Sequence, residues 1–308
     1  MSSQDQTPSF QDKLRAGTPT LSFEFYPPKD ADGWGTLYSA LGNISRRAPD
    51  LVTVTYGAGG STRQKTVDLV SRIQDELGIE TMAHLTCVGH SQGELSDILD
   101  SLHNAGVRAI MALRGDPPRG ESTFNAHPDG FAHASDLIAF IKQNWDFCIG
   151  CSFYPEKHLE AQTLAHDISY LKLKQDNGAD FAVSQIFFDN AAFTDFRAQA
   201  SAAGVQIPLI AGILPVTSLD QLGETGICRR AGTVVPPALV DYLGTGPKTE
   251  IIERGIEYAA AQCGELLTQN VAGVHFYTLN RSQSSLKVTE KLRAQGYFPL
   301  TGAGKSIK

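Results

Sequence analysis

The feature that most constrains the fold is a regular alternation of short apolar segments with amphipathic ones. Eight segments have the length and apolar character of buried strands, at residues 20–26, 51–55, 82–86, 109–113, 148–154, 181–187, 207–212 and 274–277. Helical patterns separate them: Leu164, Ile168 and Leu171 recur at helical spacing before a stop at Gly178. Because strands that alternate with helices form parallel sheets, eight such units predict a single-domain (β/α)8 TIM barrel. A doubly wound open sheet is the alternative.

Composition limits the classes of partner and the compartment. The chain has 308 residues, 42% of them hydrophobic, and a net charge of -7, which argues against nucleic acid and against an anionic membrane surface. No apolar run approaches the roughly 18 residues needed to span a bilayer, and the first residues lack a signal-peptide pattern. Five cysteines, an odd number, suit reduced thiols. We therefore expect a soluble cytoplasmic protein, and the sequence allows a homo-oligomer.

No linker divides the chain into two domains. We expect a polar N-terminal extension at residues 1–18, the barrel at residues 19–299 and a flexible tail at residues 300–308.

The segment 21–28 places a carboxylate on one face of the first predicted strand. Leu21, Phe23 and Phe25 alternate with polar residues, and a double proline then ends the strand. If the phenylalanines are buried, Glu24 points the opposite way, into the space that the strand lines. A carboxylate in that position is unfavourable unless it is paired, hydrated or used in chemistry.

The other predicted strands also end in polar residues. These are Thr55 and Tyr56, His84 and Thr86, Arg114, Gly115 and Asp116, Tyr154, Gln185, and Asn280 with Arg281. Each of them alone is equally well explained as a satisfied core group. Because barrel enzymes carry their chemistry at the C-terminal ends of the strands, the set predicts one deep pocket that recognises hydrogen-bonding heterocycles.

Other motifs give no support for a metal or a nucleotide-binding loop. Cys148 and Cys151 form a single C-x-x-C whose odd spacing points the thiols to opposite faces of a strand. The tail at residues 302–306 ends like a phosphate-binding loop but lacks its first glycine, and no H-E-x-x-H pair occurs. We therefore predict no metal site.

Eight motifs together resemble the methylenetetrahydrofolate reductase family. They are Phe23-Glu-Phe-Tyr-Pro-Pro28, Val52-Thr-Val-Thr-Tyr-Gly-Ala58, Ala83-His-Leu-Thr-Cys87, Ala112-Leu-Arg-Gly-Asp-Pro117, Tyr154-Pro-Glu-x-His158, Gln185-x-Phe-Phe-Asp189, Gly212-Ile-Leu-Pro215 and His275-Phe-Tyr-Thr-Leu-Asn-Arg281. The resemblance runs from about residue 20 to residue 298 and keeps the family order. It implies a (β/α)8 barrel that holds FAD at its C-terminal face. It also implies reduction of 5,10-methylenetetrahydrofolate to 5-methyltetrahydrofolate by NAD(P)H, a source of methyl groups for methionine synthesis.

The resemblance assigns roles near the folate. Glu24 matches the general acid that protonates the departing N10 nitrogen, and we expect desolvation to raise its pKa. Asp116 matches an aspartate between flavin and pterin. Folate contacts match Gln185, Gln221 and Arg281, and a nicotinamide-side contact matches Thr55.

For FAD, the resemblance implies a larger set, and one part of it can be checked against helix geometry. The matching positions are Tyr56, Ala58, His84, Arg114, Gly115, Asp116, Ala134, Tyr154, His158, Ala161, Asp167, Tyr170 and Lys174. The spacing of Asp167, Tyr170 and Lys174 predicts one shared helix face, opposite the apolar stripe of Leu164 and Leu171. Lys174 is suited to the pyrophosphate and Asp167 to a ribose hydroxyl.

Some positions depart from the family. Where well-known bacterial members carry Asn and Arg, this chain has Tyr170 and Leu173, which implies a weaker hold on FAD. The segment 222–235 also diverges, and it offers Thr225 where relatives stack a phenylalanine on the reducing nucleotide. Two alternatives stay open: a folate-dependent methyltransferase that binds no flavin, and a catalytically silent folate- or flavin-binding paralogue.

Overall fold

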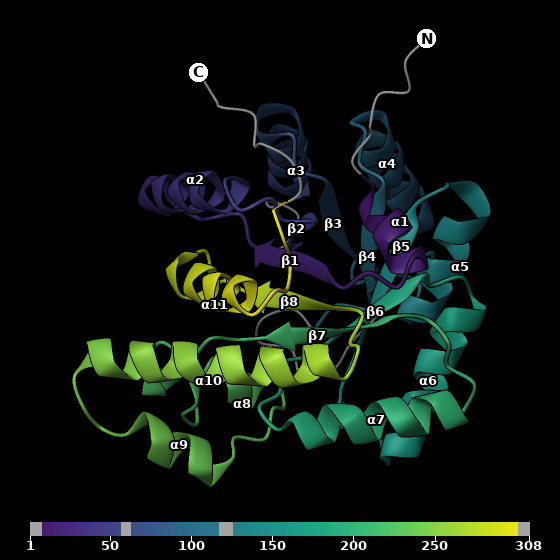
Figure 1. The fold of residues 1–308 in the computed structure, drawn as a ribbon. Coiled ribbons are helices and arrows are strands. Elements are labelled where there is room, and N and C mark those ends of the chain that lie inside the picture. The colour runs from purple at the N-terminus through teal and green to yellow at the C-terminus, as the bar shows by residue number, and fades with distance from the viewer. Residues whose placement is uncertain (1–7, 57–62, 117–125, 301–308) are drawn as a thin grey trace.

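Eight parallel strands close into a barrel in the computed structural model, which describes residues 8–56, 63–116 and 126–300 (Figure 1). The strands are β1 (Thr20–Phe25), β2 (Leu51–Val54), β3 (Thr81–Thr86), β4 (Ala109–Leu113), β5 (Cys148–Phe153), β6 (Phe181–Ser184), β7 (Leu209–Ile213) and β8 (Gly273–Tyr277). They lie in chain order, and β8 pairs with β1. The single-domain (β/α)8 TIM barrel is therefore confirmed, and the open sheet is excluded.

Helices follow the strands and cover the outside of the barrel (Figure 1). They are α2 (Ala31–Ser45), α3 (Arg63–Leu77), α4 (Gln92–Asn104), α5 (Ala134–Asn144), α6 (Leu164–Asp176), α7 (Asn190–Ala202), α10 (Lys248–Thr268) and α11 (Gln283–Ala294). The connection from β7 to α10 is longer than the others and contains η2 (Leu219–Gln221), α8 (Ile227–Arg230) and α9 (Pro237–Leu243).

Side-chain alternation along the strands separates an outer apolar layer from the barrel interior. Phe23 on β1 and Phe276 on β8 are fully buried, and their rings stack with centroids 5.4 Å apart. They belong to the main core cluster between strands and helices, together with Leu37 and Leu41 of α2. Because successive side chains of a strand point to opposite faces, the residues between them point into the barrel.

A short helix, α1 (Phe10–Arg15), closes the end of the barrel where the strands begin. Phe10 packs edge-on against Phe181 with ring centroids 5.2 Å apart, and it shares an interior cluster with Met82 and Met111. The backbone N–H of Phe10 donates to Glu80 Oε2 at 2.8 Å. The expected polar extension over residues 1–18 did not anticipate this packed helix.

The observed strand ends differ from the predicted ones for identifiable reasons. β6 stops at Ser184, short of the predicted residue 187, because the next residues leave the sheet: the N–H of Ile186 is bound by the side-chain oxygen of Gln185, at 2.8 Å. β7 begins at Leu209, directly after Pro208, which has no N–H to donate to a strand ladder. Cys148 and Cys151 lie in different core clusters, as their odd spacing predicted.

Candidate active site

Glu24 lies inside the barrel near the C-terminal end of β1. Its Oε2 is 3.6 Å from Nε2 of His84 on β3 and 3.6 Å from Nε2 of His275 on β8. The side chain of Glu24 keeps 20% of its surface exposed, whereas the two histidine side chains keep 9% and 2%, so the carboxylate is the member of the group that solvent reaches. The predicted direction of Glu24 is confirmed.

The surroundings of Glu24 lower its pKa. Burial acts to raise the pKa of Glu24, but the His275 ring and the charges that His84 and His275 carry when protonated outweigh it. Burial also lowers the pKa of His84 to about 4, so His84 is neutral near pH 7. The expectation of a raised pKa for Glu24 is wrong for this arrangement, because two imidazoles from other strands face the carboxylate.

A buried polar network continues beneath Glu24 along β8. Nδ1 of His275 lies 2.9 Å from Oγ of Ser22, and the hydroxyl of Tyr277 donates to the backbone oxygen of Ser184 at 2.7 Å. The pKa of Tyr277 lies well above its ordinary value because of burial and the charge of Glu24. Sequence reasoning gave neither His275 nor Tyr277 a role.

The signal for these two residues was present in the sequence. His275 and Tyr277 alternate with Val274 and Phe276, which are fully buried in the outer layer, so the same period of two that oriented Glu24 also orients them.

The loop after β4 carries three predicted residues at the rim of the barrel. Arg114 forms a bidentate ion pair with Glu160, with N–O distances of 2.6 and 2.8 Å, which raises the pKa of Arg114. Gly115 has φ of +90°, and a Cβ there would lie 2.6 Å from Cγ1 of Val88, so only glycine fits. Asp116 is exposed.

The loop after β5 contacts α6. The N–H of His158 donates to Asp167 at 2.8 Å, and Nζ of Lys174 donates to the backbone oxygen of Ser152 at 2.8 Å. Asp167 and Lys174 thus face β5 and its loop, and they lie on the barrel side of α6 beside buried Leu171. The prediction that they lie opposite the apolar stripe is wrong, because that side of the helix also covers the end of β5.

Four other residues predicted to contact the cofactor lie on several different elements. Tyr170 is exposed on α6 and its ring contacts His166, so it does not share the barrel-facing side with Asp167 and Lys174. Ala134 is buried at the start of α5. The backbone oxygen of Ala161 accepts a bond from Lys157 at 2.7 Å. Burial raises the pKa of Tyr154, next to Gln185, to about 12.

Residues near the end of β2 are only partly described. The N–H of Thr55 donates to the backbone oxygen of Phe25 at 2.8 Å, which extends the β1–β2 ladder by one bond. The hydroxyl of Tyr56 lies 3.1 Å from Nε2 of His90. Ala58 lies outside the described residues.

A cavity of about 360 Å3 joins two of the predicted folate contacts. Gln221 and Arg281 both line it, together with Lys248 and Tyr26. The side-chain oxygen of Gln221 accepts the backbone N–H of Thr217 at 2.7 Å, which orients its amide. The remaining predicted folate contact, Gln185, does not line this cavity. Its side chain lies beside that of Tyr154.

The comparisons with known proteins agree with this geometry. The family model described as methylenetetrahydrofolate reductase matches residues 9–293. The chain belongs to the methylenetetrahydrofolate reductase family. The match begins at Ser9, the N-cap of α1, so the family region includes the helix that closes the barrel.

Curated members of the methylenetetrahydrofolate reductase family match at about one third identity. The 5,10-methylenetetrahydrofolate reductase of Escherichia coli is 35% identical over 279 residues, which cover 90% of this chain and 91% of the relative. Methylenetetrahydrofolate reductase 1 of Schizosaccharomyces pombe is 34% identical over 281 residues, covering 89% of this chain and 46% of the relative. The chain therefore spans about half the length of the plant and fungal relatives that it matches.

Among solved structures, one similar fold carries a folate in its description. An uncharacterized protein from Clostridium thermocellum, described as binding two copies of 5-methyl-5,6,7,8-tetrahydrofolic acid, aligns with a TM-score of 0.64 at 13% identity. The alignment covers 93% of this chain and 98% of that protein. At this identity the likeness extends to the fold alone.

The residues present fit the FAD that the methylenetetrahydrofolate reductase family implies. Nε2 of His84 is buried and has no hydrogen-bond partner among the described residues. A buried ring nitrogen of that kind is stabilised by a polar group of a bound molecule.

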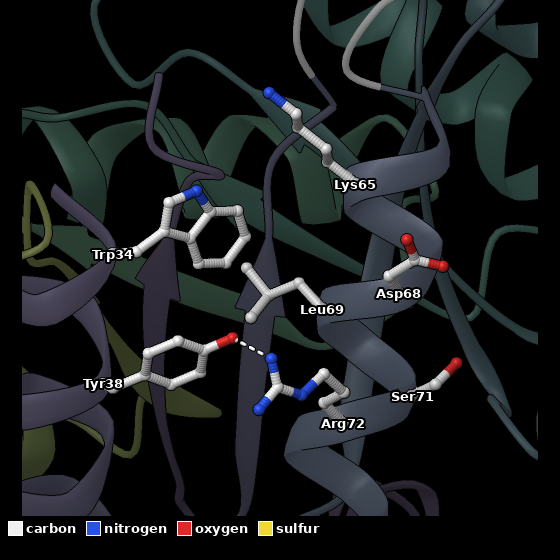
Figure 2. Close-up of a pocket in the computed structure, with 7 residues that line it drawn as sticks. All are labelled: Trp34, Tyr38, Lys65, Asp68, Leu69, Ser71 and Arg72. Atoms are coloured by element: carbon white, nitrogen blue, oxygen red, sulfur yellow. Dashed lines mark hydrogen bonds between the residues drawn. The ribbon is translucent and has the colours of Figure 1, made fainter. Parts of the chain in front are cut away.

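A larger cavity, of about 660 Å3, lies away from the barrel interior. Trp34 and Tyr38 of α2 face Leu69 and Arg72 of α3 across it, with Lys65 at one end (Figure 2). It contains none of the site residues predicted for the methylenetetrahydrofolate reductase family. Within the described ranges, no helix combines the length and apolar character needed to cross a membrane.

Proposed function

We propose that this protein reduces 5,10-methylenetetrahydrofolate to 5-methyltetrahydrofolate, with FAD as cofactor and NAD(P)H as donor. The observation that carries the proposal is the partly exposed carboxylate of Glu24 inside the barrel, flanked by His84 and His275. Opening the five-membered ring of this substrate requires one proton at N10, and a carboxylic acid at the floor of the mouth is suited to that task.

The proposed FAD site lies on the β3–β6 side of the barrel. The residues assigned to it are Tyr56, Ala58, His84, Arg114, Gly115, Asp116, Ala134, Tyr154, His158, Ala161, Asp167 and Lys174, with Tyr170 at its edge. When bound, FAD supplies the hydride chemistry that protein side chains lack. Lys174, which reaches the end of β5, offers a positive charge to the pyrophosphate.

This chain's own residues then bind the folate and control one proton. Because its pKa is lowered, Glu24 first takes up a proton from the solvent that reaches its exposed side; it then gives that proton to N10, which opens the ring and leaves a cation at N5. The carboxylate of Asp116, which is exposed, is suited to accept hydrogen bonds from the pterin and to stabilise that cation. Arg281, with Gln221 in the 360 Å3 cavity, is suited to the carboxylates of the glutamate tail, and Gln185 to the pterin side.

Both substrates enter by one mouth, since α1 closes the other end of the barrel. The nicotinamide, contacted by Thr55, and the pterin must then occupy the same space in turn, which gives a ping-pong sequence. Steady-state kinetics should show parallel lines, with folate competing against the nucleotide. The product would supply methyl groups for methionine synthesis.

The test is Glu24→Gln, which keeps the size of the side chain but cannot donate an acidic proton. We expect flavin reduction by NAD(P)H to stay nearly intact and folate turnover to fall by about 10²–10⁴-fold. Glu290→Gln, on the outer surface of α11, is the matched control and should behave as wild type. Folate turnover of Glu24→Gln within twofold of wild type would remove Glu24 from this role.

A visible absorption spectrum of the purified protein tests the proposal independently. Oxidised-flavin bands together with turnover of methylenetetrahydrofolate would support it. A protein that binds folate without those bands would be a methyltransferase, and one that binds ligands without turnover would be a silent paralogue.

A further inference from the structure

The cavity between α2 and α3 has the volume of a small-molecule site and an aromatic lining. Its volume is about 660 Å3, within the range of roughly 300–1,000 Å3 that ligand sites have. Trp34 and Tyr38, one helical turn apart on α2, line one side, with ring centroids 5.7 Å apart and planes 30° from each other. Leu69 of α3, which is buried, lies between the two helices (Figure 2). The lining therefore suits a flat ring.

At one end of this cavity, Arg72 and Tyr38 hold each other in place. The guanidinium of Arg72 lies over the Tyr38 ring, with its central carbon 4.9 Å from the ring centroid, and it also donates to the Tyr38 hydroxyl. Nε of Arg72 donates to Glu76 at 2.8 Å, so a carboxylate balances the positive charge. Because the side chains already have partners, little conformational freedom is lost when a ligand packs beside them.

The other end of the cavity holds hydrogen-bond donors that have no acceptor. The ammonium of Lys65 points toward the Trp34 side and away from Asp68 (Figure 2). Among the residues that the structure describes, neither this ammonium nor Nε1 of Trp34 has a hydrogen-bond or ion-pair partner, whereas Asp68 has an interaction of its own. Since an ammonium and an indole N–H can only donate, the group that complements this end is an anion.

We propose that the cavity between α2 and α3 binds a small aromatic anion. The flat ring of the ligand packs against Trp34 and Leu69, and its carboxylate or phosphate group accepts hydrogen bonds from Lys65 and from Nε1 of Trp34. A neutral ring would leave the two donors unused, and an inorganic anion would leave the aromatic side uncovered. The binding goes beyond the proposed reductase activity, because the residues that line this cavity are not among those assigned to FAD or folate.

A second copy of the chain is the competing occupant, because tryptophan, tyrosine and arginine also concentrate in protein interfaces. A stable interface buries about 800 Å2 of each partner and has an apolar centre. Within the described ranges, none of the exposed large apolar side chains belongs to α2 or α3. The apolar surface is thus confined to the cavity, and this favours a small molecule over a second copy.

The test uses the two tryptophans of the chain, Trp34 and Trp145. In the protein saturated with FAD and labelled with ¹⁵N-tryptophan, each residue gives one indole N–H signal in NMR, and Trp145→Phe assigns them. The indole of Trp145 donates to Asp100 at 2.9 Å and serves as the internal reference. The probes are adenosine 5′-monophosphate for a phosphate and 4-hydroxybenzoate for a carboxylate. We expect the Trp34 signal to move and saturate with at least one probe while the Trp145 signal stays, and the tighter probe identifies the anionic group.

Matched variants separate the contact to the anion from the contact to the ring. Lys65→Gln should weaken binding of the effective probe by roughly fivefold or more in calorimetry, because it removes a charge-assisted hydrogen bond. Trp34→Leu should weaken it further, since both the ring contact and the indole N–H are lost. Lys172→Gln removes a surface lysine that pairs with Asp176 on α6, and this control should bind as wild type. Neutral adenosine should bind the wild type and Lys65→Gln equally, and more weakly than its monophosphate binds the wild type.

Three results would overturn the proposal. A Trp34 signal that stays unchanged with both probes up to millimolar concentration would mean that the cavity binds no such ligand. Equal binding of both probes by Lys65→Gln and the wild type would refute the contact to the anion. A Trp34 signal that changes with protein concentration and not with the probes, together with a larger particle in sedimentation, would make the cavity an interface between copies.

Discussion

Replacing Phe10 by alanine should destabilise the whole barrel, although Phe10 lies in a helix of only six residues near the chain terminus. Its ring is 1% exposed and packs against Phe181, the first residue of β6, inside the barrel. The interior cluster around it contains the first residues of four strands, so α1 is part of the core that the strands share.

Two routes set the magnitude of the effect. If α1 stays in place, truncating a buried phenylalanine to alanine leaves a cavity and costs about 3–5 kcal/mol. If α1 instead detaches, Phe10 and Leu14 both lose their burial, at about 1.5–3 kcal/mol each, or about 3–6 kcal/mol together. Both routes therefore give a loss of at least about 3 kcal/mol in the free energy of unfolding.

Urea denaturation followed by circular dichroism measures this loss. With a slope of about 3 kcal/mol per molar urea, the midpoint should fall by about 1 M. Arg15→Ala, an exposed position on the same helix, is the control and should change stability by less than about 0.5 kcal/mol. A loss below about 1 kcal/mol in Phe10→Ala would refute the argument that α1 completes the core.

Three further predictions concern other parts of the structure. Burial raises the pKa of Glu80 above its ordinary value, so the folded state holds its proton to higher pH than the unfolded chain, and the side chain lowers stability as pH rises from the unfolded pKa through the folded one. In urea denaturation, Glu80→Gln should therefore gain stability relative to wild type as pH rises through this range, and an equal difference at every pH would contradict the argument. Gly212→Ala should lose at least about 2 kcal/mol in thermal unfolding, because its Cβ would lie 2.2 Å from the backbone oxygen of Ser184; an unchanged melting temperature would contradict the strand packing. Lys174→Gln should release FAD roughly tenfold faster on dilution, followed by flavin fluorescence, and an equal rate would place the pyrophosphate elsewhere.

The sequence predicted what depends on local periodicity. The alternation of Leu21, Phe23 and Phe25 oriented Glu24 correctly, and the strand–helix alternation predicted the barrel, because both patterns follow from the geometry of one element at a time. The imidazole of His275 beside Glu24 could not be predicted in the same way. It depends on the register between β1 and β8, two strands that lie near opposite ends of the chain and meet only when the barrel closes.

Two errors have the same origin. The pKa of Glu24 was expected from burial alone, whereas the structure places two rings from other strands against it. Asp167 and Lys174 were assigned to an outward face because the apolar stripe of α6 was taken to mark the whole inner side. In the structure the inner side of α6 also meets the polar backbone at the end of β5, and the two charged residues bond there.

The pairing of β8 with β1 also decides how copies of this chain can meet. In the described part of the chain, every strand of the barrel has a hydrogen-bonded neighbour on each side, so this sheet presents no unpaired edge to solvent. A strand from another chain therefore finds no free backbone donors or acceptors on this barrel. Aggregation by edge-to-edge strand pairing is prevented. Association between folded copies is therefore left to helix surfaces and loops, where side chains rather than backbone groups determine the partner.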